Sequence, residues 1–357
     1  MLDEGSLNPG DFLLPERSLA DQFSVSRPTV RRALASLVER GLLVNHPGLG
    51  TSVRSVAGRK RQERWRVIGL LVPNFSNQFF IEVTEAIEQA ALQRGYQVLL
   101  ANTRHQVSFE ELHLQQLANA HVSGVVLVHD PYSPFPEAVT LLKAAGIPYV
   151  ALFNSPSAAD CDSVILNDHS GITEAMRYLY SLGHRRIAFC RAVGGNYAHP
   201  RERAYCEFVA QNGLLSLPQY LVPSVAGPGG EGLQILRDLF HGELAPTALL
   251  AGNDHTALLC HKYLTSLGKQ VPRDVSLVGF DNLRFTEHLP TPLTTVDQPK
   301  REMGRRALEM LLEQIELGIS STPRIERFRP HLVIRESCGI APNRMETDGE
   351  LPTARTA

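Results

Sequence analysis

Residues 23–41 read FSVSRPTVRRALASLVERG, and this stretch predicts a helix with two unlike faces. Ser26 is a typical N-cap, and Pro28 falls in the first turn, where its missing N–H breaks no hydrogen bond. Arg27 and Arg31 are four residues apart and therefore share one face. The other face carries an apolar stripe at helical spacing, made of Val30, Ala33, Leu34, Leu37 and Val38. A charged helix face is usually only solvated, so the flanking sequence must decide its role.

The segments on either side place this helix in a larger pattern. Residues 15–23, PERSLADQF, predict a shorter helix, and only Ser24 and Val25 separate the two helices. Two short helices with so tight a turn are typical of a helix-turn-helix, whose second helix points its first residues into a DNA major groove. Gly41 ends the second helix, and residues 42–53, LLVNHPGLGTSV, predict a β-hairpin with the shape of a wing.

The composition limits the class of protein. The chain has 357 residues, of which 43% are hydrophobic and 20% charged, as expected for a globular protein of two or three domains. No apolar run approaches the roughly 20 residues of a membrane span, and no signal-peptide pattern is visible, so we expect no membrane association. The five cysteines are scattered and form no CxxC pair, which favours a reduced, cytoplasmic setting.

The net charge of −2 hides an asymmetry. Residues 1–66 contain 11 Lys/Arg and 7 Asp/Glu, a net charge of +4, while the rest contains 24 and 30, a net charge of −6. A small basic head on a larger acidic body indicates an anionic partner for the head.

The texture of the sequence changes at Val67, where short apolar runs begin to alternate with amphipathic helical stretches. The runs are VIGLLV, YQVLLA, GVVLV, IPYVAL, SVIL, RIAFC, TALLAG and VSLVGF. Each has the length of a strand buried on both faces, and the alternation predicts an α/β protein with parallel sheets in two lobes. We therefore expect a DNA-binding domain at 1–53, a linker at 54–66, a two-lobed α/β domain at 67–338, for which the family resemblance described below implies ligand binding and dimerisation, and a disordered tail at 339–357.

Residues 12–53 resemble the winged helix-turn-helix of the GntR family of bacterial regulators. The resemblance implies that the ER pair, the SRPTVR motif and the wing tip approach DNA, through Arg17, Ser26, Arg27, Thr29, Arg31, Gly48 and Gly50. An arginine in the groove can bond guanine bidentately, while hydroxyl groups hold phosphates. Leu49 stands where the family often has Arg, which removes a phosphate contact. Most of the family's long first helix is absent, so either the start is misassigned or the domain is truncated.

Residues 66–338 resemble the effector domain of the LacI family, whose fold is shared with periplasmic sugar-binding proteins. The signposts are VIGLLVPNFSNQFF, LGHRRIAFC, ALLAGNDHTALLCHKYLTSLGKQVPRDVSLVGFDN and PLTTVDQPKREMGRRALEMLL. The resemblance implies two lobes that close on a small polar ligand. A GntR-type head on a LacI-type body is similar to the arabinose repressor subgroup.

The expected ligand site follows from the rule that open α/β sheets bind ligands beyond the carboxyl ends of their strands. The candidates there are Asn74, Phe75, Phe79, His129, Asp130, Asn154, Asn253 and Asp281. Arg203, in RERAY, falls where the family places a ligand-binding arginine. Amides, carboxylates and a guanidinium suit sugar hydroxyls, and a phenyl ring can stack on a sugar face. The alternatives stay open: Asn253, Asp254 and Asp281 can cap helices or turns, and both phenylalanines can be packing residues. Asn167 and Asp168 are expected to hold a turn.

The sequence predicts a ligand-responsive repressor of carbohydrate-utilisation genes that binds a double-stranded, pseudo-palindromic DNA operator as a homodimer, with a small sugar as effector. GxGxxG, GxxxxGK[ST], GxSxG and HExxH are all absent, so we expect no enzyme, cofactor, catalytic residue or metal. A periplasmic-type sugar-binding protein without a DNA role and a nucleoside-responsive regulator are the alternatives.

Overall fold

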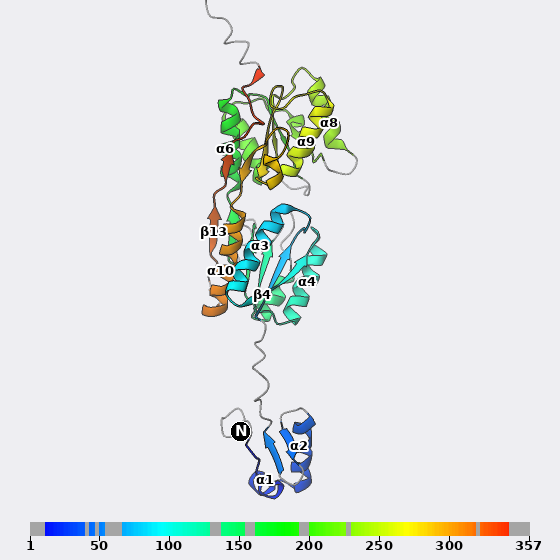
Figure 1. Ribbon diagram of the computed structural model, residues 1–357, viewed down its shortest axis with the longest axis vertical. Helices are drawn as coiled ribbons and strands as arrows, with labels where there is room; N and C mark the ends of the chain where they lie inside the picture. The colour runs from blue at the N-terminus through cyan, green and yellow to red at the C-terminus, as the bar shows by residue number, and fades with distance from the viewer. Residues whose placement is uncertain are drawn as a thin grey trace, which may run out of the picture. The chain divides into compact units, whose positions relative to one another are not determined.

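The computed structural model describes residues 11–39, 43–46, 50–53, 66–128, 137–153, 161–192, 200–225, 230–318 and 322–342. The chain divides into two units, Met1–Trp65 and Arg66–Ala357, which are described separately below (Figure 1). The predicted linker, except Arg66, and the predicted tail from residue 343 onward lie outside the described residues. Their predicted boundaries and the predicted disorder therefore stay predictions.

The described residues of the first unit form two helices and a two-stranded hairpin: α1 (Glu16–Phe23), α2 (Arg27–Glu39), β1 (Leu43–His46) and β2 (Gly50–Val53). Ser24 adopts a left-handed conformation with φ 53° and ends α1, so the chain turns at once into α2. The two strands pair antiparallel, with Leu43 opposite Val53. A small core of Leu19, Ala20 and Val30 holds the helices together. The predicted winged helix-turn-helix is confirmed in these elements.

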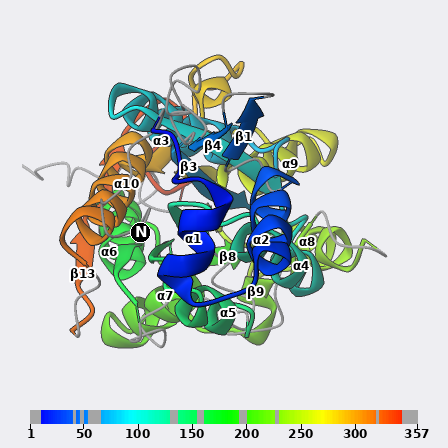
Figure 2. The same ribbon diagram turned by 90° about the horizontal axis from the view of Figure 1, so that it is seen from below.

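Lobe 1 of the second unit is a six-stranded parallel sheet in the order β13-β7-β6-β5-β3-β4. Its strands are β3 (Arg66–Val72), β4 (Tyr96–Asn102), β5 (Gly124–Val128), β6 (Tyr149–Leu152), β7 (Ser163–Leu166) and β13 (Ile325–Phe328). Its helices are α3 (Gln78–Gln93), α4 (Val107–Asn119), α5 (Val139–Ala144) and α10 (Lys300–Leu317). Helices α3 and α10 lie side by side on one face (Figures 1 and 2), and α4 and α5 cover the other.

Lobe 2 is a second six-stranded sheet, in the order β14-β12-β11-β10-β8-β9, in which only the pairing of β14 is antiparallel. Its strands are β8 (Ile187–Cys190), β9 (Leu221–Val222), β10 (Ala248–Ala251), β11 (Ser276–Asp281), β12 (Thr294–Asp297) and β14 (His331–Val333). Its helices are α6 (Asp168–Ser181), α7 (Pro200–Gln211), α8 (Glu231–His241) and α9 (Asp254–Ser266), with 3-10 turns η1 (Pro218–Tyr220) and η2 (Arg284–Glu287). Helices α6 and α7 cover one face, and α8 and α9 the other.

The eight apolar runs of the sequence correspond to β3, β4, β5, β6, β7, β8, β10 and β11, so the predicted α/β class and two lobes are confirmed. The chain passes between the lobes three times: after β7, after β12 and after β13. The central strands of each sheet are parallel, so their carboxyl ends lie on the same side of that sheet. Residues that follow these strands are therefore close together, and this is where such sheets bind ligands. None of the helices in the described ranges is long and apolar enough to cross a membrane.

Candidate DNA-binding and effector-binding sites

The predicted DNA-contacting side chains of the head are exposed. Arg17 lies on α1, and Ser26, Arg27, Thr29 and Arg31 lie at the start of α2. The Ser26 hydroxyl accepts a hydrogen bond from the Thr29 backbone N–H at 3.4 Å and lies 2.7 Å from the Thr29 hydroxyl, so Ser26 caps α2 as predicted. Donor groups and guanidinium groups are thus gathered at one helix N-terminus, where backbone N–H groups also favour phosphate.

Arg31 is held by a carboxylate of the neighbouring helix. Its Nε and NH2 donate to the two oxygens of Glu16 at 3.2 and 2.8 Å. The guanidinium lowers the pKa of Glu16 below its usual range, because it bonds the charged form of the carboxyl. The Arg31 side chain remains 69% exposed, so DNA phosphates can compete for it.

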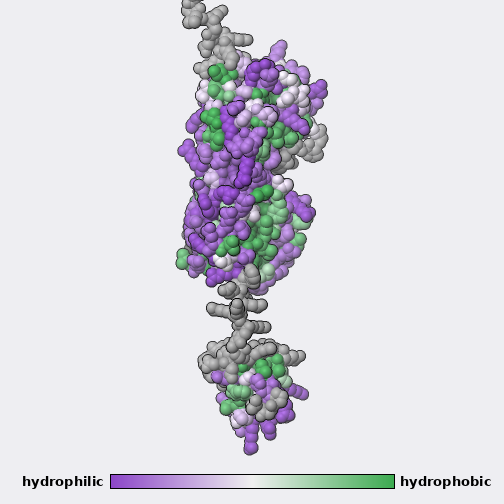
Figure 3. All heavy atoms as spheres, in the orientation of Figure 1, coloured by the Kyte–Doolittle hydropathy of each residue, from purple (hydrophilic) through white to green (hydrophobic). Residues whose placement is uncertain are grey.

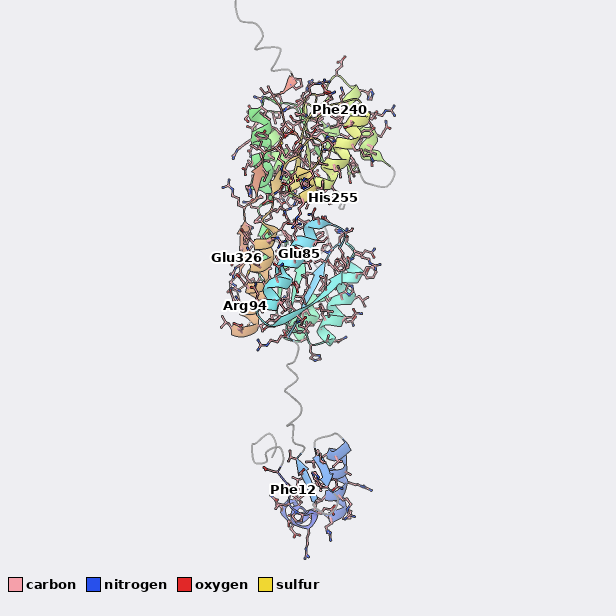
Figure 4. All side chains as sticks on the ribbon, viewed as in Figure 1. Phe12, Glu85, Arg94, Phe240, His255 and Glu326 are labelled. Carbon is pink, nitrogen blue, oxygen red and sulfur yellow. The ribbon has the colours of Figure 1, made fainter. Side chains whose placement is uncertain are left out.

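The hairpin of the wing is contacted by the aromatic side chain of Phe12. Phe12, which is labelled in Figure 4, packs against His46 with ring centroids 5.5 Å apart, and His46 Nε2 lies 2.9 Å from the Ser52 hydroxyl. Gly50 opens β2 with φ 107°, a conformation that other residues rarely adopt. Gly48, at the predicted wing tip, lies outside the described residues.

The second site is built around a buried arginine of lobe 2. Arg201, on α7, donates through Nε to Asp168 at 2.7 Å and through NH1 to the Gly252 carbonyl at 2.7 Å. Its guanidinium lies 3.6 Å from the centroid of the Phe280 ring and 3.7 Å from an oxygen of Asp281. Its side chain is only 13% exposed. Arg201 therefore links the ends of β10 and β11 to the first turn of α6.

Asp281 is the last residue of β11 and is buried, with φ 120°, a strained backbone for a residue with a side chain. Its carboxylate accepts a 2.5 Å hydrogen bond from Gln298, and its carbonyl accepts one of 2.5 Å from the Lys300 ammonium. Burial raises the pKa of Asp281 to about 6, although Arg201 and Lys300 oppose the shift. Strain and desolvation together are typical of a functional position.

The sequence left open whether Asn253 and Asp254 contact a ligand or stabilise a helix or turn, and the structure gives the two residues different contacts. Asn253 caps α9, accepting from the Thr256 N–H at 2.8 Å. Asp254 is fully buried and accepts from the Leu283 N–H at 2.8 Å and the Thr295 hydroxyl at 2.6 Å. Burial, and then the nearby Asp281, raise the pKa of Asp254 to about 8. Asp254 therefore fastens the segment that follows β11 rather than facing a ligand.

Asp254 is closely surrounded by other residues. A Cβ atom at Gly279 would lie 2.2 Å from an oxygen of Asp254, so only glycine leaves room for the carboxylate at this point of β11. Leu283 is fully buried in the core of lobe 1, although it follows a strand of lobe 2. Phe285 packs on the same core, and its ring centroid lies 5.4 Å from that of His255 on α9. His255 is labelled in Figure 4.

The candidates in lobe 1 have different environments. The Asn74 side chain accepts from the Ser76 N–H and hydroxyl, both at 2.7 Å, and so forms a turn directly after β3. Phe75 is 43% exposed, whereas Phe79 is buried in the lobe 1 core, 5.0 Å from Phe153. Phe79 is thus a packing residue in this structure. His129, Asp130 and Asn154 lie outside the described residues, and their roles stay predictions.

The structure does not bring Arg203 to the strand ends. Its side chain is 68% exposed and lies 4.0 Å from Glu207, one turn further along α7. Arg201 occupies the expected place because it shares a helix face with Ala204 and Tyr205, three and four residues later, and both are buried. That spacing was visible in PRERAY and is the signal that sequence reasoning missed.

Three further residues at this edge were not predicted. Arg191, directly after β8, donates through Nε and NH2 to Glu202 at 2.6 and 2.7 Å. Gln298 and Lys300, which flank a proline after β12, both reach Asp281. Among the described residues, no group of three or more His, Cys, Asp or Glu side chains is arranged to hold a metal ion.

Comparison with protein families matches both units. Residues 1–53 match the gntR family of bacterial regulatory proteins, and residues 176–338 match a periplasmic binding protein-like domain. The chain is 30% identical over 339 residues to the arabinose metabolism transcriptional repressor of Geobacillus stearothermophilus, covering 93% of each chain. It is 28% identical over 297 residues to the HTH-type transcriptional repressor PurR of Glaesserella parasuis, covering 81% of this chain and 86% of that one.

Solved structures of the LacI family share the fold. A LacI family transcriptional regulator from Enterococcus faecium, with bound ribose, is 26% identical with a TM-score of 0.65, covering 77% of this chain and 99% of that one. A LacI family regulator from Lactobacillus casei, with bound glucose, is 26% identical with a TM-score of 0.63, covering 76% and 99%.

A winged helix-turn-helix with exposed arginines, joined to a two-lobed body with polar strand ends, defines a ligand-responsive DNA-binding transcription regulator. The chain belongs to the family of bacterial regulators that join a GntR-type DNA-binding domain to a LacI-like, periplasmic-binding-protein-like effector domain, the family of the arabinose metabolism transcriptional repressor.

Proposed function

We propose that this protein is a cytoplasmic, homodimeric repressor of carbohydrate-utilisation genes whose operator binding is controlled by a small sugar. The observation that carries the proposal is the cluster around Arg201, where a desolvated guanidinium, carboxylates and amides meet at the ends of β10 and β11. Such groups bond sugar hydroxyls and reject ligands that leave them unpaired. Relatives solved with ribose and glucose support the ligand class.

The proposed effector site consists of side chains from both lobes. In lobe 2 it includes Arg201, Asn253 and Asp281, and in lobe 1 it includes Asn74 and Phe75. His129, Asp130 and Asn154 are included in the proposed site on the basis of the sequence alone. Arg203 is replaced by Arg201 in this assignment, because Arg203 faces away from the strand ends.

Coupling between ligand and DNA is proposed to run through the segment after β11. Leu283 is buried in the lobe 1 core, while its N–H is bonded to Asp254 at the start of α9. A ligand that contacts Asn253 and Asp281 therefore acts on a segment that both lobes share. Ligand binding shifts DNA affinity only if the ligand favours one arrangement of the lobes over another.

Dimerisation of the body is proposed to use an apolar surface of lobe 1. Ile81 and Leu92 on α3, and Leu99 and Leu100 on the edge strand β4, are exposed by 43%, 58%, 49% and 40%. Figure 3 shows apolar surface over this part of lobe 1. A solvent-exposed edge strand with adjacent leucines is a natural pairing surface. A two-fold dimer would present two heads to two half-sites.

The test separates the two sites by substitution. Arg27→Ala should weaken binding to a DNA fragment from the gene's own neighbourhood, measured by gel retardation, and leave sugar binding intact. Asp281→Ala should remove the response to the sugar while DNA binding survives. The sugar is found by a thermal-shift screen of pentoses, hexoses, disaccharides and nucleosides, since a bound ligand raises apparent stability. Equal loss of both activities in either variant would contradict the assignment, and a nucleoside as the only binder would replace the sugar.

A further inference from the structure

The chain that leaves β11 begins with two consecutive residues in unusual backbone conformations. Asp281 has φ 120° and Asn282 has φ 51°. Side chains disfavour both conformations, although asparagine tolerates the second better than most residues do. Such a backbone persists only where the surrounding contacts hold it. The contacts of Asn282 therefore decide where the chain goes after β11.

Residues 282–293, called the projecting loop below, start in lobe 2 and enter the core of the other lobe. Leu283 is fully buried in the lobe 1 core, and Phe285 packs on the same core. Within the loop, the Thr286 hydroxyl donates to the Leu283 carbonyl at 2.6 Å, and the Leu293 N–H donates to the Thr286 carbonyl at 2.8 Å. The projecting loop is thus a compact part of lobe 2 whose first residues belong to lobe 1.

One side chain from another segment, Arg335 after β14, bonds three parts of the projecting loop. Its NH2 donates to Asn282 Oδ1 at 2.8 Å. Its NH1 donates to the Leu293 carbonyl at 2.8 Å and to the Thr286 hydroxyl at 3.3 Å. The Arg335 side chain is only 17% exposed. A planar guanidinium presents its N–H groups in fixed directions, so Arg335 fixes the start, the middle and the end of the loop together.

The close partners of Arg335 are neutral oxygen atoms, which makes its role geometric. The carboxylate of Glu287 lies 4.0 Å away, and that side chain is 54% exposed. Hydrogen bonds from a charged donor to neutral acceptors are stronger than those between neutral groups. The loop is therefore held by directed bonds more than by an ion pair.

The side-chain amide of Asn282 is held at both ends. Its oxygen accepts from Arg335, and its Nδ2 donates to Asp297 Oδ1 at 2.8 Å. The Asn282 backbone N–H also donates to the Thr295 hydroxyl at 3.3 Å. Asp297 is the last residue of β12, where the chain starts its passage to α10 of lobe 1. Through Asn282, Arg335 is thus connected to one of the three crossings between the lobes.

We infer that Arg335 is a positioning residue for the response to the effector. By holding the projecting loop on lobe 2, it links the position of Asp281 at the proposed effector site to the position of Leu283 in the lobe 1 core. The inference deepens the proposed function, and its functional part rests on it. Without Arg335 the loop can separate from lobe 2 while Leu283 stays in lobe 1, so a ligand that moves one lobe no longer moves the other.

The first measurement needs no ligand and uses hydrogen–deuterium exchange of the full chain. Arg335→Met should raise exchange in peptides of the projecting loop and also in peptides of β3 and α3, whose residues share the lobe 1 core with Leu283. Arg273→Met is the matched control, because Arg273 also lies in lobe 2 and pairs with Asp274 at 3.2 Å but is 69% exposed. The control should leave exchange in lobe 1 unchanged. Faster exchange confined to lobe 2 in Arg335→Met would mean a local structural role and would overturn the inference.

The second measurement is the ratio of the operator Kd with and without saturating sugar, with arabinose, ribose and glucose as probes. Arg335→Met should lower this ratio roughly threefold or more. Because the sugar is saturating, a weaker affinity for sugar does not by itself lower the ratio. Arg335→Lys keeps the charge but not the planar fork, so it should lower the ratio as well. An undiminished ratio in either variant would overturn the inference while the proposed function stands.

A second variant covers the case in which Arg335→Met does not fold. Asn282→Gly removes the amide that joins Arg335 to Asp297, and glycine adopts a φ of 51° without strain. It must raise exchange in lobe 1 and lower the ratio, or the inference fails. If the wild-type chain responds to none of the three sugars, the proposed sugar effector fails, and the exchange measurement alone decides the role of Arg335.

Discussion

Two arginine–carboxylate pairs, one in each unit, have nearly the same nitrogen–oxygen distance and opposite surroundings. Arg31 on the head meets Glu16 at 2.8 Å with 69% of its side chain exposed, whereas Arg201 on the body meets Asp168 at 2.7 Å with 13% exposed. An exposed pair is worth little, because water and salt screen it. A buried pair cannot be broken without leaving an uncompensated charge.

The difference matches the two kinds of partner. The head must exchange a protein carboxylate for a DNA phosphate, and a weak pair lets Arg31 do so at little cost. The body must recognise a small molecule in one orientation, which requires Arg201 to stay fixed by Asp168 and the Gly252 carbonyl. The same residue type is therefore a movable charge in one unit and a rigid template in the other.

The largest effect should come from breaking the buried pair. Arg201→Met leaves Asp168 without its cation and Asp281 with Lys300 alone, so the free energy of unfolding should fall by about 3–5 kcal/mol, measured by urea denaturation. Arg203→Met, two residues along the same helix but exposed, is the control and should change it by less than about 0.5 kcal/mol. Equal effects of the two variants would show that Arg201 is not buried in solution.

An intermediate effect should come from His184, the buried neutral histidine of the body. It lies 2.8 Å from the Thr247 hydroxyl and 2.9 Å from the Ser276 hydroxyl, and burial lowers its pKa to about 4. Between the unfolded value near 6.5 and about 4, the unfolded chain binds a proton that the folded chain does not. Its stabilising contribution is therefore complete above about pH 6.5 and lost as the pH falls, by about 3 kcal/mol at pH 4.

The measurement compares urea denaturation of the wild type and His184→Gln at pH 7 and pH 4.5. The difference between the two proteins isolates His184 from the buried carboxyls, whose raised pKa values act in the opposite direction. A difference that does not depend on pH would mean that His184 is solvated or protonated in the folded chain.

The smallest effect should come from the exposed pair. Glu16→Gln frees Arg31 and removes a negative charge beside the predicted DNA face, so operator affinity should rise roughly two- to threefold. Fluorescence anisotropy at two salt concentrations measures the change, which should shrink as salt rises. Asp21→Asn, on the same short helix, is the matched control. A loss of affinity beyond about tenfold would reveal that Glu16 positions Arg31 rather than competing for it.

The sequence predicted eight strands of the body, because each contains a continuous apolar run. One of them, β4, was expected to be buried on both faces and is instead a partly exposed edge strand. It missed β9, β12, β13 and β14, since LV, TTVD, IERF and HLV are very short or partly polar strands at or near sheet edges or lobe crossings. Their pairing depends on which lobe the chain has entered, and no local pattern contains that information.

The candidate site shows the same limit. Asn253 and Asp281 follow apolar runs directly, so a rule about strand ends finds them. Arg201 comes from a helix that crosses toward the site, and the choice between it and Arg203 required helical phase rather than position in the chain. Phe79 comes after a strand, as the rule requires, yet it is the second residue of α3 and packs in the lobe 1 core.

Strand β13 pairs with β7, although the two strands lie far apart in the sequence. Asp162 bonds Arg324, 162 residues later, and α10 supplies part of the lobe 1 core. During synthesis, most of lobe 2 leaves the ribosome as one continuous segment. Lobe 1 begins earlier, but its sheet and core are complete only after α10 and β13 have been synthesised. Contacts so distant in sequence form slowly and expose apolar surface meanwhile. A chain released early by a stop codon before residue 300 would thus carry an unfinished lobe 1 and be a substrate for chaperones and proteases.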